Sequence, residues 1–335
     1  VVDWPLDFAA TETGQSLSQL YLRYIYPTLK SLPKLVPGGR PDAAALVHDR
    51  YNYRKFLEAQ GASPAAIELL RLGYDSDHGS AAWSLMQERD ALGAQSLFTI
   101  VGGNDRLPRA FAEALGEKIR YGSAIAGITQ DAERVSVRTA AGDLFHGDRL
   151  IVTLPFSVLG PVVKDARLSE RKRSLIENLE YDRTTKVFFQ VRKRLWIERG
   201  LSGYMATDLP IERVRPDSGS EPNQRALIST YVQGAGSRRF EQMSEAERLQ
   251  KTAAWIEQLL PGFSATVEGG LSYCWALDPH QQGSYPLFKP GQIAWIPEMG
   301  AAEGRIHFAG EHTSLWTGWM EGAFESAHRV LAELR

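Results

Sequence analysis

The sequence predicts a mixed α/β protein whose two domains are interleaved along the chain. Its 335 residues exceed what a single hydrophobic core usually supports. Helix signals and strand signals alternate along the chain, and 43% hydrophobic with 23% charged residues is an ordinary globular composition. We therefore expect two domains, each built from separate chain segments.

Residues 1–95 are expected to be mainly helical. In the segment GASPAAIELLRLG, Ser63 can cap a helix, Pro64 takes its first position and Gly73 ends it. At residue 98 the pattern changes to FTIVGGNDRL, a short apolar run with paired glycines. A helix is expected to follow from about Pro108 to Gly116.

Strand signals dominate the next part of the chain. Val135 and Val137 alternate with polar residues before a turn at residues 141–142. Further strands are expected at 150–154, which looks buried, at 184–192 and from 225. A later helix begins with the capping box Ser244–Glu247 and stops at residues 261–262, and residues 215–224 are expected to form a flexible polar loop.

Charge and composition exclude several classes of partner. The net charge of −2 includes no basic stripe for nucleic acid, and no run approaches the roughly 18 apolar residues of a membrane span. The opening ten residues carry two acids and no basic signal-peptide region. We expect a cytoplasmic protein without nucleic-acid or membrane partners, with a periplasmic or secreted location left open. Cys274 is the only cysteine, so an intrachain disulfide is excluded.

The stretch FAGEHTSLWTGWMEGAFESAHR at residues 308–329 carries the strongest functional signal. Glycines permit close backbone approach, tryptophans supply flat apolar walls, and a helix start offers unpaired N–H groups with a partial positive charge. This combination suits a planar cofactor that becomes anionic. The alternative is an ordinary capped helix that buries Ala323, Ala327, Val330 and Leu331.

The order of several segments resembles the flavin-containing amine oxidases, in the branch of bacterial L-amino-acid oxidases and monoamine oxidases. These segments are VGGNDRLPRAF, LIVTLPFSVL, TKVFFQV, YCWALDPHQQGSYPLFKPGQ and the C-terminal stretch, and the similarity covers most of residues 48–335. The resemblance implies an FAD/NAD(P)-binding domain of the GR2 type interleaved with a substrate domain. It assigns residues 98–175 and 278–335 to the FAD domain, and 1–97 and 176–277 to the substrate domain.

One departure from the family is large. Family members begin with a βαβ unit whose Gly-x-Gly-x-x-Gly turn holds the cofactor pyrophosphate, and this sequence has none. Its only Gly-x-Gly, Gly234–Gly236, lacks the third glycine. The segment where family amino-acid oxidases keep an arginine for the substrate carboxylate is also missing. We expect a C-terminal part of an amine oxidase, and a homodimer or a missing N-terminal segment or subunit stays open.

The resemblance implies catalytic roles for three residues. Trp319 and Tyr285 correspond to the aromatics that flank the substrate amine, and Lys186 to the lysine that holds a water beside flavin N5. Each also has a structural interpretation, because aromatic residues often pack in cores and a strand lysine is often solvated. Arg215, with Arg213, follows TDLP and is a candidate for the substrate carboxylate or a surface pair.

The resemblance also implies contacts to FAD. The residues concerned are Ile125, Trp275, Gly310, Glu311, Gly318, Trp319 and Met320. Ser284 stands where monoamine oxidases carry the cysteine bonded to the flavin, so FAD is expected to be non-covalent. The Glu311 carboxylate is expected to accept a hydrogen bond from backbone or water. No metal site is expected: His307 and His312 lie in a turn-rich motif without zinc-ligand spacing, and a structural role is expected for both.

The expected function is FAD-dependent oxidative deamination of an L-amino acid. Hydride passes from the substrate Cα to flavin N5, O2 reoxidises the flavin to give H2O2, and the imine hydrolyses to oxo acid and ammonia. The alternatives are a monoamine or polyamine oxidase, and a non-catalytic fragment or subunit that needs a missing N-terminal piece. A Ser-His-Asp hydrolase is disfavoured, because no Gly-x-Ser-x-Gly elbow exists.

Overall fold

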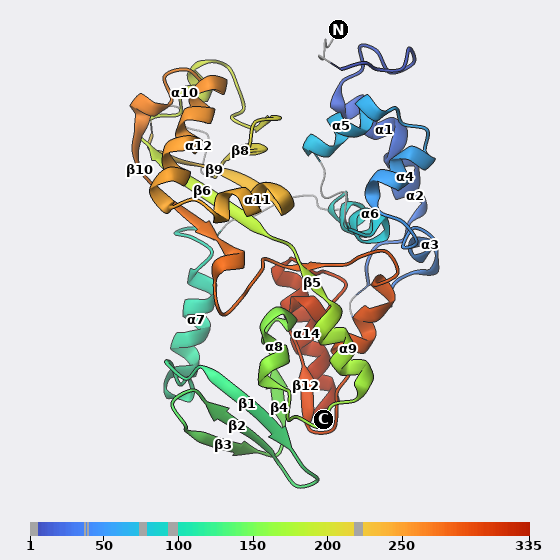
Figure 1. Cartoon of the computed structure of the whole chain (residues 1–335), viewed down its shortest axis with the longest axis vertical. Coiled ribbons are helices and arrows are strands. Elements are labelled where there is room, and N and C mark those ends of the chain that lie inside the picture. The colour runs from blue at the N-terminus through green and yellow to red at the C-terminus, as the bar shows by residue number, and fades with distance from the viewer. Residues whose placement is uncertain (1–5, 37, 39, 74–78, 93–99, 218–223) are drawn as a thin grey trace. The chain divides into compact units, whose positions relative to one another are not determined.

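The structure is a computed structural model that describes residues 6–36, 38, 40–73, 79–92, 100–217 and 224–335. The chain divides into two compact units, and it passes between them several times. Unit 1 comprises Val1–Ser31, Pro41–Leu85 and Leu179–Ala294. Unit 2 comprises Leu32–Arg40, Met86–Asn178 and Trp295–Arg335. Mixed helices and strands in two interleaved units agree with the predicted fold class (Figure 1).

The unit boundaries differ in places from the segments expected for the FAD and substrate domains. Residues 278–294, expected with the C-terminal FAD segment, lie in unit 1. Residues 32–40 and 86–92, expected in the substrate domain, lie in unit 2. The assignment of FAD and substrate to particular segments stays a prediction.

The N-terminal part of the chain is helical, as predicted. Its helices are α1 (Leu17–Tyr24), α2 (Tyr26–Ser31), α3 (Ala43–Leu46), α4 (Tyr53–Ala59), α5 (Pro64–Gly73) and α6 (Ala81–Ala91). The predicted cap of α5 is confirmed, since the Ala66 N–H donates to Oγ of Ser63 at 3.2 Å. Helix α6 runs across a unit boundary, so its residues up to Leu85 belong to unit 1 and those from Met86 to unit 2.

A five-stranded antiparallel sheet is the main β structure of unit 1. Its strands, in spatial order, are β10 (Val267–Cys274), β6 (Thr184–Val191), β9 (Ala226–Gln233), β8 (Arg213–Pro216) and β7 (Met205–Ala206). The strands expected at 184–192 and from 225 are β6 and β9, at the centre of this sheet. A separate two-stranded ladder joins β5 (Glu180–Tyr181) to β11 (Pro286–Leu287).

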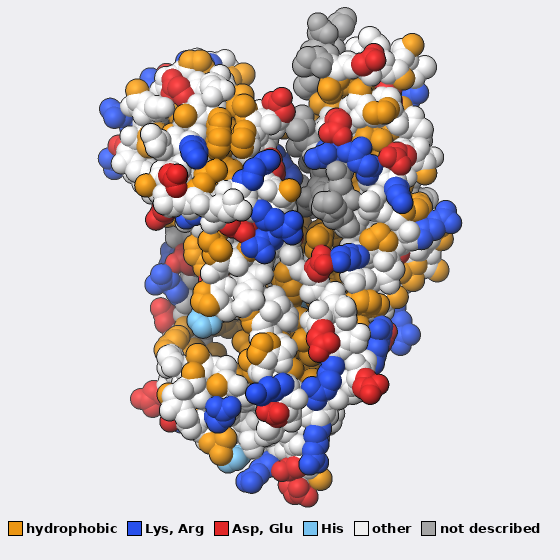
Figure 2. Space-filling view, in the orientation of Figure 1, with side chains coloured by type: hydrophobic (Ala, Val, Ile, Leu, Met, Phe, Trp, Pro, Cys, Tyr) orange, Lys and Arg blue, Asp and Glu red, His pale blue; other side chains and the backbone are white. Residues whose placement is uncertain are grey.

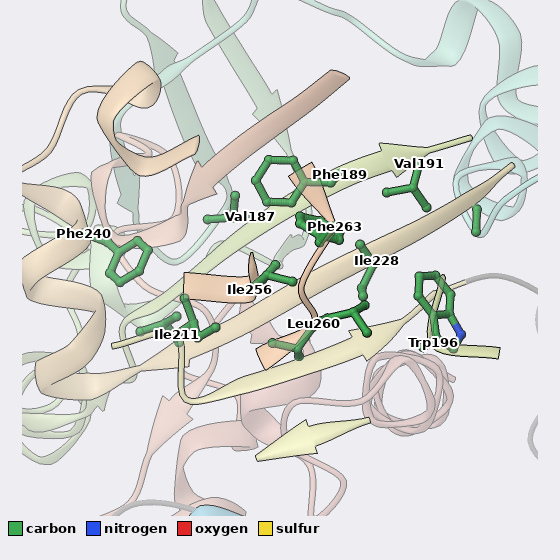
Figure 3. Close-up of a cluster of buried hydrophobic side chains, with 13 residues drawn as sticks. Val187, Phe189, Val191, Trp196, Ile211, Ile228, Phe240, Ile256, Leu260 and Phe263 are labelled. Atoms are coloured by element: carbon green, nitrogen blue, oxygen red, sulfur yellow. The ribbon is translucent and has the colours of Figure 1, made fainter. Parts of the chain in front are cut away.

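One face of the five-stranded sheet is covered by an apolar core (Figure 3). Val187, Phe189 and Val191 alternate along β6 and point to the same side, where they pack with Ile256 and Phe263. The covering helices are α10 (Leu195–Glu198), α11 (Gly234–Glu241) and α12 (Glu245–Leu259). The predicted capping box of α12 is confirmed, since Ser244 and Glu247 exchange hydrogen bonds.

Unit 2 contains two small sheets and several helices. The meander of β1 (Ile125–Gln130), β2 (Val135–Thr139) and β3 (Leu144–Gly147) forms one sheet. A parallel pair of β4 (Leu150–Val152) and β12 (Ile306–Phe308) forms the other. The helices are α7 (Arg106–Leu115), α8 (Phe156–Val162), α9 (Glu170–Asn178), α13 (Ile296–Gly300) and α14 (Met320–Glu333). Figure 1 shows α8, α9 and α14 around β4 and β12.

Short 3-10 turns complete the structure, namely η1 (Gly116–Lys118), η2 (Ser264–Thr266), η3 (Trp275–Leu277), η4 (Ile293–Trp295) and η5 (Glu311–Thr313). Among the described residues, no helix is long and apolar enough to cross a membrane. On the face drawn in Figure 2, basic and acidic side chains are mixed.

Three local expectations are corrected by the structure. Residues Arg215 and Pro216, expected in a flexible loop, belong to β8, because Val214 is buried and pairs with Thr230 of β9. The strand expected to be buried at 150–154 is shorter, and Ile151 is 43% exposed. Helix α7 begins two residues before Pro108, at Arg106, since proline is tolerated in the first helical turn. Parts of the expected run at 98 and of the loop at 218–223 lie outside the described residues.

Candidate active site

The polar face of the five-stranded sheet carries the predicted lysine. Strand alternation places Lys186 opposite the core face, and it pairs with Tyr231 of β9. The Lys186 Nζ atom lies 5.2 Å from the centre of the Tyr231 ring. Burial lowers the pKa of Lys186, the positive charge of Arg215 lowers it further, and Asp217 acts in the opposite direction.

Two arginines of β8 extend this polar face. The Cζ atoms of Arg213 and Arg215 lie 5.8 and 5.5 Å from the centre of the Tyr231 ring. Nε of Arg215 lies 3.5 Å from Oδ1 of Asp217. The structure thus places Arg215 near Lys186, on a strand that holds its backbone in register with β9.

Tyr285 is held by a hydrogen-bond network within unit 1. Its hydroxyl donates to Oδ2 of Asp182 at 3.0 Å, and Nε2 of Gln233 donates to both of these oxygens. Gln233 in turn accepts from Arg213 at 2.7 Å. On the ring itself, Trp83 stacks with a centroid distance of 5.9 Å and an interplanar angle of 18°. Buried Asp182, Gln233 and Trp83 therefore fix the orientation of Tyr285.

Ser284 and Cys274, the two residues considered for covalent flavin attachment, both make hydrogen bonds within unit 1. The Ser284 hydroxyl lies 2.9 Å from Oγ1 of Thr184 and donates to the carbonyl of Asp182. Cys274 is buried and accepts from Oγ1 of Thr185 at 3.3 Å. Trp275 begins η3, is 37% exposed and meets Tyr273 edge to face at 4.7 Å.

The C-terminal motif forms a turn between β12 and η5 in unit 2. Gly310 has a φ of 124°, and a Cβ there would lie 2.5 Å from the His312 ring, so glycine is required. The Gly310 N–H donates to Oγ of Ser326 on α14 at 2.9 Å. The turn is thereby tied to the middle of the C-terminal helix.

Glu311 lies in the same turn and is half-buried. The Gly318 N–H donates to its Oε2, so the predicted backbone hydrogen bond is confirmed. Burial raises the pKa of Glu311 to about 7, against the lowering effect of this hydrogen bond. The neutral form is therefore well populated near pH 7.

Helix α14 begins at Met320, as the sequence predicts. Its N-cap residue, Trp319, makes no side-chain capping hydrogen bond, and its carbonyl accepts from the Gly322 N–H at 3.1 Å. The partial positive charge of a helix start favours a negatively charged group. Trp319 and Met320 are 55% and 57% exposed. The Trp319 indole N–H donates to Oε1 of Gln87 at 2.6 Å, which orients the ring.

The structure groups the predicted residues by unit. Lys186, Arg215, Trp275 and Tyr285 lie in unit 1. Ile125, Gly310, Glu311, Gly318, Trp319 and Met320 lie in unit 2, where Ile125 is half-buried at the start of β1 and the other five belong to the turn and the start of α14. The pairing of Tyr285 with Trp319 joins two units and stays a prediction.

The two histidines of the C-terminal motif, His307 and His312, are buried and contact neighbouring side chains. Nδ1 of His307 lies 2.8 Å from Oε2 of Glu333. His312 is buried against Phe156, with ring centroids 4.8 Å apart, and burial lowers its pKa to about 3. Within the described part of the chain, no group of three His, Cys, Asp or Glu residues could hold a metal ion.

Comparison with known proteins agrees with this arrangement of elements. The sequence model described as flavin containing amine oxidoreductase matches residues 49–334. The chain belongs to this family. Membership identifies an oxidoreductase family whose cofactor is FAD.

Curated relatives extend this result. The chain is 34% identical to "Putative L-amino-acid oxidase YobN" of Bacillus subtilis, over 97% of this chain and 71% of that protein. It is 27% identical to an L-amino-acid oxidase of Siganus canaliculatus, over 97% of this chain and 64% of that protein. An L-amino-acid oxidase of Protobothrops flavoviridis is 27% identical, over 94% of this chain and 65% of that protein. The chain thus spans about two thirds of the length of these relatives.

Solved structures share the fold. Cyclohexylamine oxidase from Brevibacterium oxydans superposes with a TM-score of 0.78 at 19% identity, over 99% of this chain and 76% of that chain. Putrescine oxidase bound to putrescine superposes with a TM-score of 0.79 at 17% identity, over 99% of this chain and 77% of that chain. These flavin amine oxidase structures therefore establish the fold of this family member.

The residues of unit 2 fit the ring end of FAD. A glycine-bearing turn, a helix start without a side-chain cap and an exposed tryptophan lie within residues 310–320. A helix start suits the negative charge of a reduced flavin ring, and the raised pKa of Glu311 limits repulsion from that carboxyl. The glycine-rich turn that binds pyrophosphate in this family is not among the 335 residues, so the fit covers one end of the cofactor.

Sequence reasoning missed the residues that support the site. Asp182, Gln233 and Trp83 hold Tyr285, Gln87 holds Trp319, and Tyr231 lies among the three cations. Strand alternation could have placed Tyr231 on the polar face of the sheet. Val232 points into the apolar core, so its neighbours Tyr231 and Gln233 point to the opposite face. Asp182, Trp83 and Gln87 lack a local pattern, since their partners are distant in sequence.

Proposed function

We propose that this protein is an FAD-dependent L-amino-acid oxidase. The observation that carries the proposal is the cationic strand β8, which presents Arg215 beside the lysine expected at the flavin. An amino acid carries a carboxylate that the corresponding amine lacks, and a guanidinium is well suited to bind it. When bound, FAD supplies the acceptor for the hydride of the substrate Cα and returns the electrons to O2 as H2O2.

The overall reaction converts an L-amino acid, O2 and water to an oxo acid, ammonia and H2O2. The side chains bind and orient the substrate. Arg215 binds the substrate carboxylate, and Tyr285 and Trp319 each offer an aromatic ring to the substrate amine. The network of Asp182 and Gln233 holds the Tyr285 ring in position, while Gln87 holds Trp319. The substrate amine reacts in its neutral form, so a charged general base is not required.

Lys186 positions water in this proposal. Burial and Arg215 lower its pKa, so its ammonium loses a proton more readily than that of a solvated lysine. It can therefore hold a water by hydrogen bonds and exchange a proton with it. Two observations support non-covalent FAD. Ser284 has no sulfur with which to form a thioether, and the Cys274 thiol is buried and accepts a hydrogen bond from Thr185.

The proposal is tested by a peroxide-coupled assay of the full-length protein with the common L-amino acids and with the corresponding amines, which lack the carboxylate. An amino-acid oxidase produces peroxide with one or more of the amino acids and not with the amines. The Lys186→Met variant should lose about 100-fold or more in kcat/KM, the scale of lost proton-transfer catalysis. Lys193→Met is the matched control, because Lys193 is an exposed lysine paired with Glu198.

Each other outcome identifies a different function. Faster turnover of an amine would replace the proposal with a monoamine or polyamine oxidase. Colourless protein without peroxide production from any amino acid or amine would indicate a fragment or subunit that needs an N-terminal partner. Full activity of Lys186→Met would remove Lys186 from the reaction.

A further inference from the structure

A cluster of three cations surrounds one aromatic ring in unit 1. Lys186, Arg213 and Arg215 lie 5.2, 5.8 and 5.5 Å from the centre of the Tyr231 ring. The three side chains lie on the sheet face opposite the apolar core, as strand alternation requires. We name Lys186, Arg213, Arg215 and Tyr231 the cation cluster.

The charge of the cation cluster is only partly balanced by the residues that the structure describes. Among them, Asp217 is the one carboxylate within ion-pair distance of the cluster, 3.5 Å from Arg215. Nε of Arg215 is buried and makes no hydrogen bond. A guanidinium is a cation in proteins, and the contact of 3.5 Å between Nε of Arg215 and Asp217 is longer than an ordinary hydrogen bond. The cluster therefore retains positive charge and donor capacity for an anion.

Three members of the cation cluster, Arg213, Arg215 and Tyr231, line a cavity that can accept a small ligand. The cavity has a volume of about 420 Å³, and its walls include Arg213, Arg215 and Tyr231 together with Tyr204 and Met205. This volume falls in the range of small-molecule sites, roughly 300–1,000 Å³. Apolar walls beside two guanidiniums suit a short methylene chain that ends in a carboxylate.

Hydrogen bonds link Arg213, in the cavity wall, to Tyr285, which the proposed function assigns to the substrate. Arg213 donates to Gln233, and Gln233 donates to the Tyr285 hydroxyl and to Asp182. One hydrogen-bond network thus positions both the Arg213 guanidinium and the Tyr285 ring. A substrate beside Tyr285 is therefore separated from the Arg213 guanidinium by the side chain of Gln233.

We propose that the cation cluster binds a second carboxylate, on the side chain of the substrate, so that the preferred substrates are acidic L-amino acids. A neutral amino acid supplies one carboxylate, which Arg215 can bind, and leaves Arg213 without an anionic partner among the described residues. A dicarboxylic amino acid supplies an anion for each guanidinium. This inference rests on the proposed oxidase function and adds the chemical class of its substrate.

The test compares L-glutamate with L-glutamine, which have the same shape and differ in the side-chain charge. For the full-length protein we expect kcat/KM to be 10- to 100-fold higher for L-glutamate, which corresponds to about 1.4–2.8 kcal/mol. Arg213→Gln should lower kcat/KM for L-glutamate at least tenfold more than kcat/KM for L-glutamine, and so abolish the preference. Arg225→Gln is the matched control, since Arg225 is an exposed arginine of the same sheet region paired with Glu268.

A binding measurement separates this inference from the proposed function. Calorimetry with glutarate should detect binding to the wild-type protein and to Arg225→Gln, and at least tenfold weaker binding to Arg213→Gln, with circular dichroism confirming that all variants fold. Oxidation of L-glutamine at the rate of L-glutamate would overturn the inference and leave the oxidase function intact. Glutarate binding without any oxidation would support the cation cluster as a dicarboxylate site and overturn the oxidase function. Absence of glutarate binding would overturn the inference.

Discussion

The surroundings of the Glu311 side chain disfavour the negatively charged form of its carboxyl group. The side chain is half-buried in the turn after β12, where the Gly318 N–H is its hydrogen-bond donor. Burial raises its pKa to about 7, above the ordinary value of 4.5. The folded protein therefore keeps a proton between pH 4.5 and 7 that the unfolded chain releases, so the contribution of Glu311 to stability falls as pH rises through this window.

Replacing Glu311 by Gln should remove this pH dependence and keep an acceptor for the Gly318 N–H. At pH 8 the variant should be more stable than the wild type by up to roughly 3 kcal/mol, and at pH 4.5 the two should be similar. Urea unfolding at both pH values measures the difference. Glu113→Gln on the exposed side of α7 is the control and should show no such change. Equal stability of Glu311→Gln and wild type at pH 8 would contradict the assignment.

At the scale of single residues, the sequence was informative where a residue acts through its own chemistry. The C-terminal motif contains Glu311 and Gly310, and their backbone hydrogen bonds follow from the turn that the glycine permits. Asp182 could not be predicted in this way, because it contacts Tyr285, which is more than 100 residues distant. Only folding brings such partners together.

Helix α14 shows how small residues determine the packing of an element. Its buried residues are Gly322, Ser326 and Val330, while Leu331 is 54% exposed. The alternative interpretation of this segment, a helix that buries Ala323, Ala327, Val330 and Leu331, holds for Val330 alone of these four. Close approach explains the difference, because a Cβ at Gly322 would lie 2.3 Å from the carbonyl oxygen of Trp316.

Gly322→Ala should therefore destabilise the protein by about 1–3 kcal/mol, the usual cost of inserting a methyl group into a packed site. Urea unfolding measures the change, and Glu321→Ala in the exposed first turn of the same helix is the control. Intrinsic helix propensity alone predicts the opposite sign, a gain of about 1 kcal/mol. A stabilised Gly322→Ala variant would thus show that contact with Trp316 does not limit the position of α14.

Element prediction succeeded where the ends of an element carry local signals. Helices α5 and α12 begin at Ser63 and Ser244, whose capping hydrogen bonds are present. Strand β8 was missed because its sequence, RVRP, has two arginines and a proline and resembles a polar loop. Its strand conformation depends on pairing with β9 and on burial of Val214, which are tertiary effects.

At the scale of the whole molecule, the two main β structures differ in how they are connected. The five-stranded sheet and its apolar core come from one continuous stretch of chain within residues 184–274. The parallel pair of β4 and β12 joins Leu150 to Ile306, so it forms only after a long loop closes. Composition and alternation predict that such strands exist, but they contain no information on which strand pairs with a distant one.

This difference predicts an order of local stability that native-state hydrogen exchange can measure. The amides of β6 and β9 should exchange most slowly, because both strands are paired on two sides and bury Val187, Val232 and their neighbours in the core. The amides of β1–β3 should exchange faster, since β3 is an edge strand whose four residues are exposed or half-buried. Equal or greater protection in β3 than in β6 would show that the apolar core of unit 1 is not the most stable part of the chain.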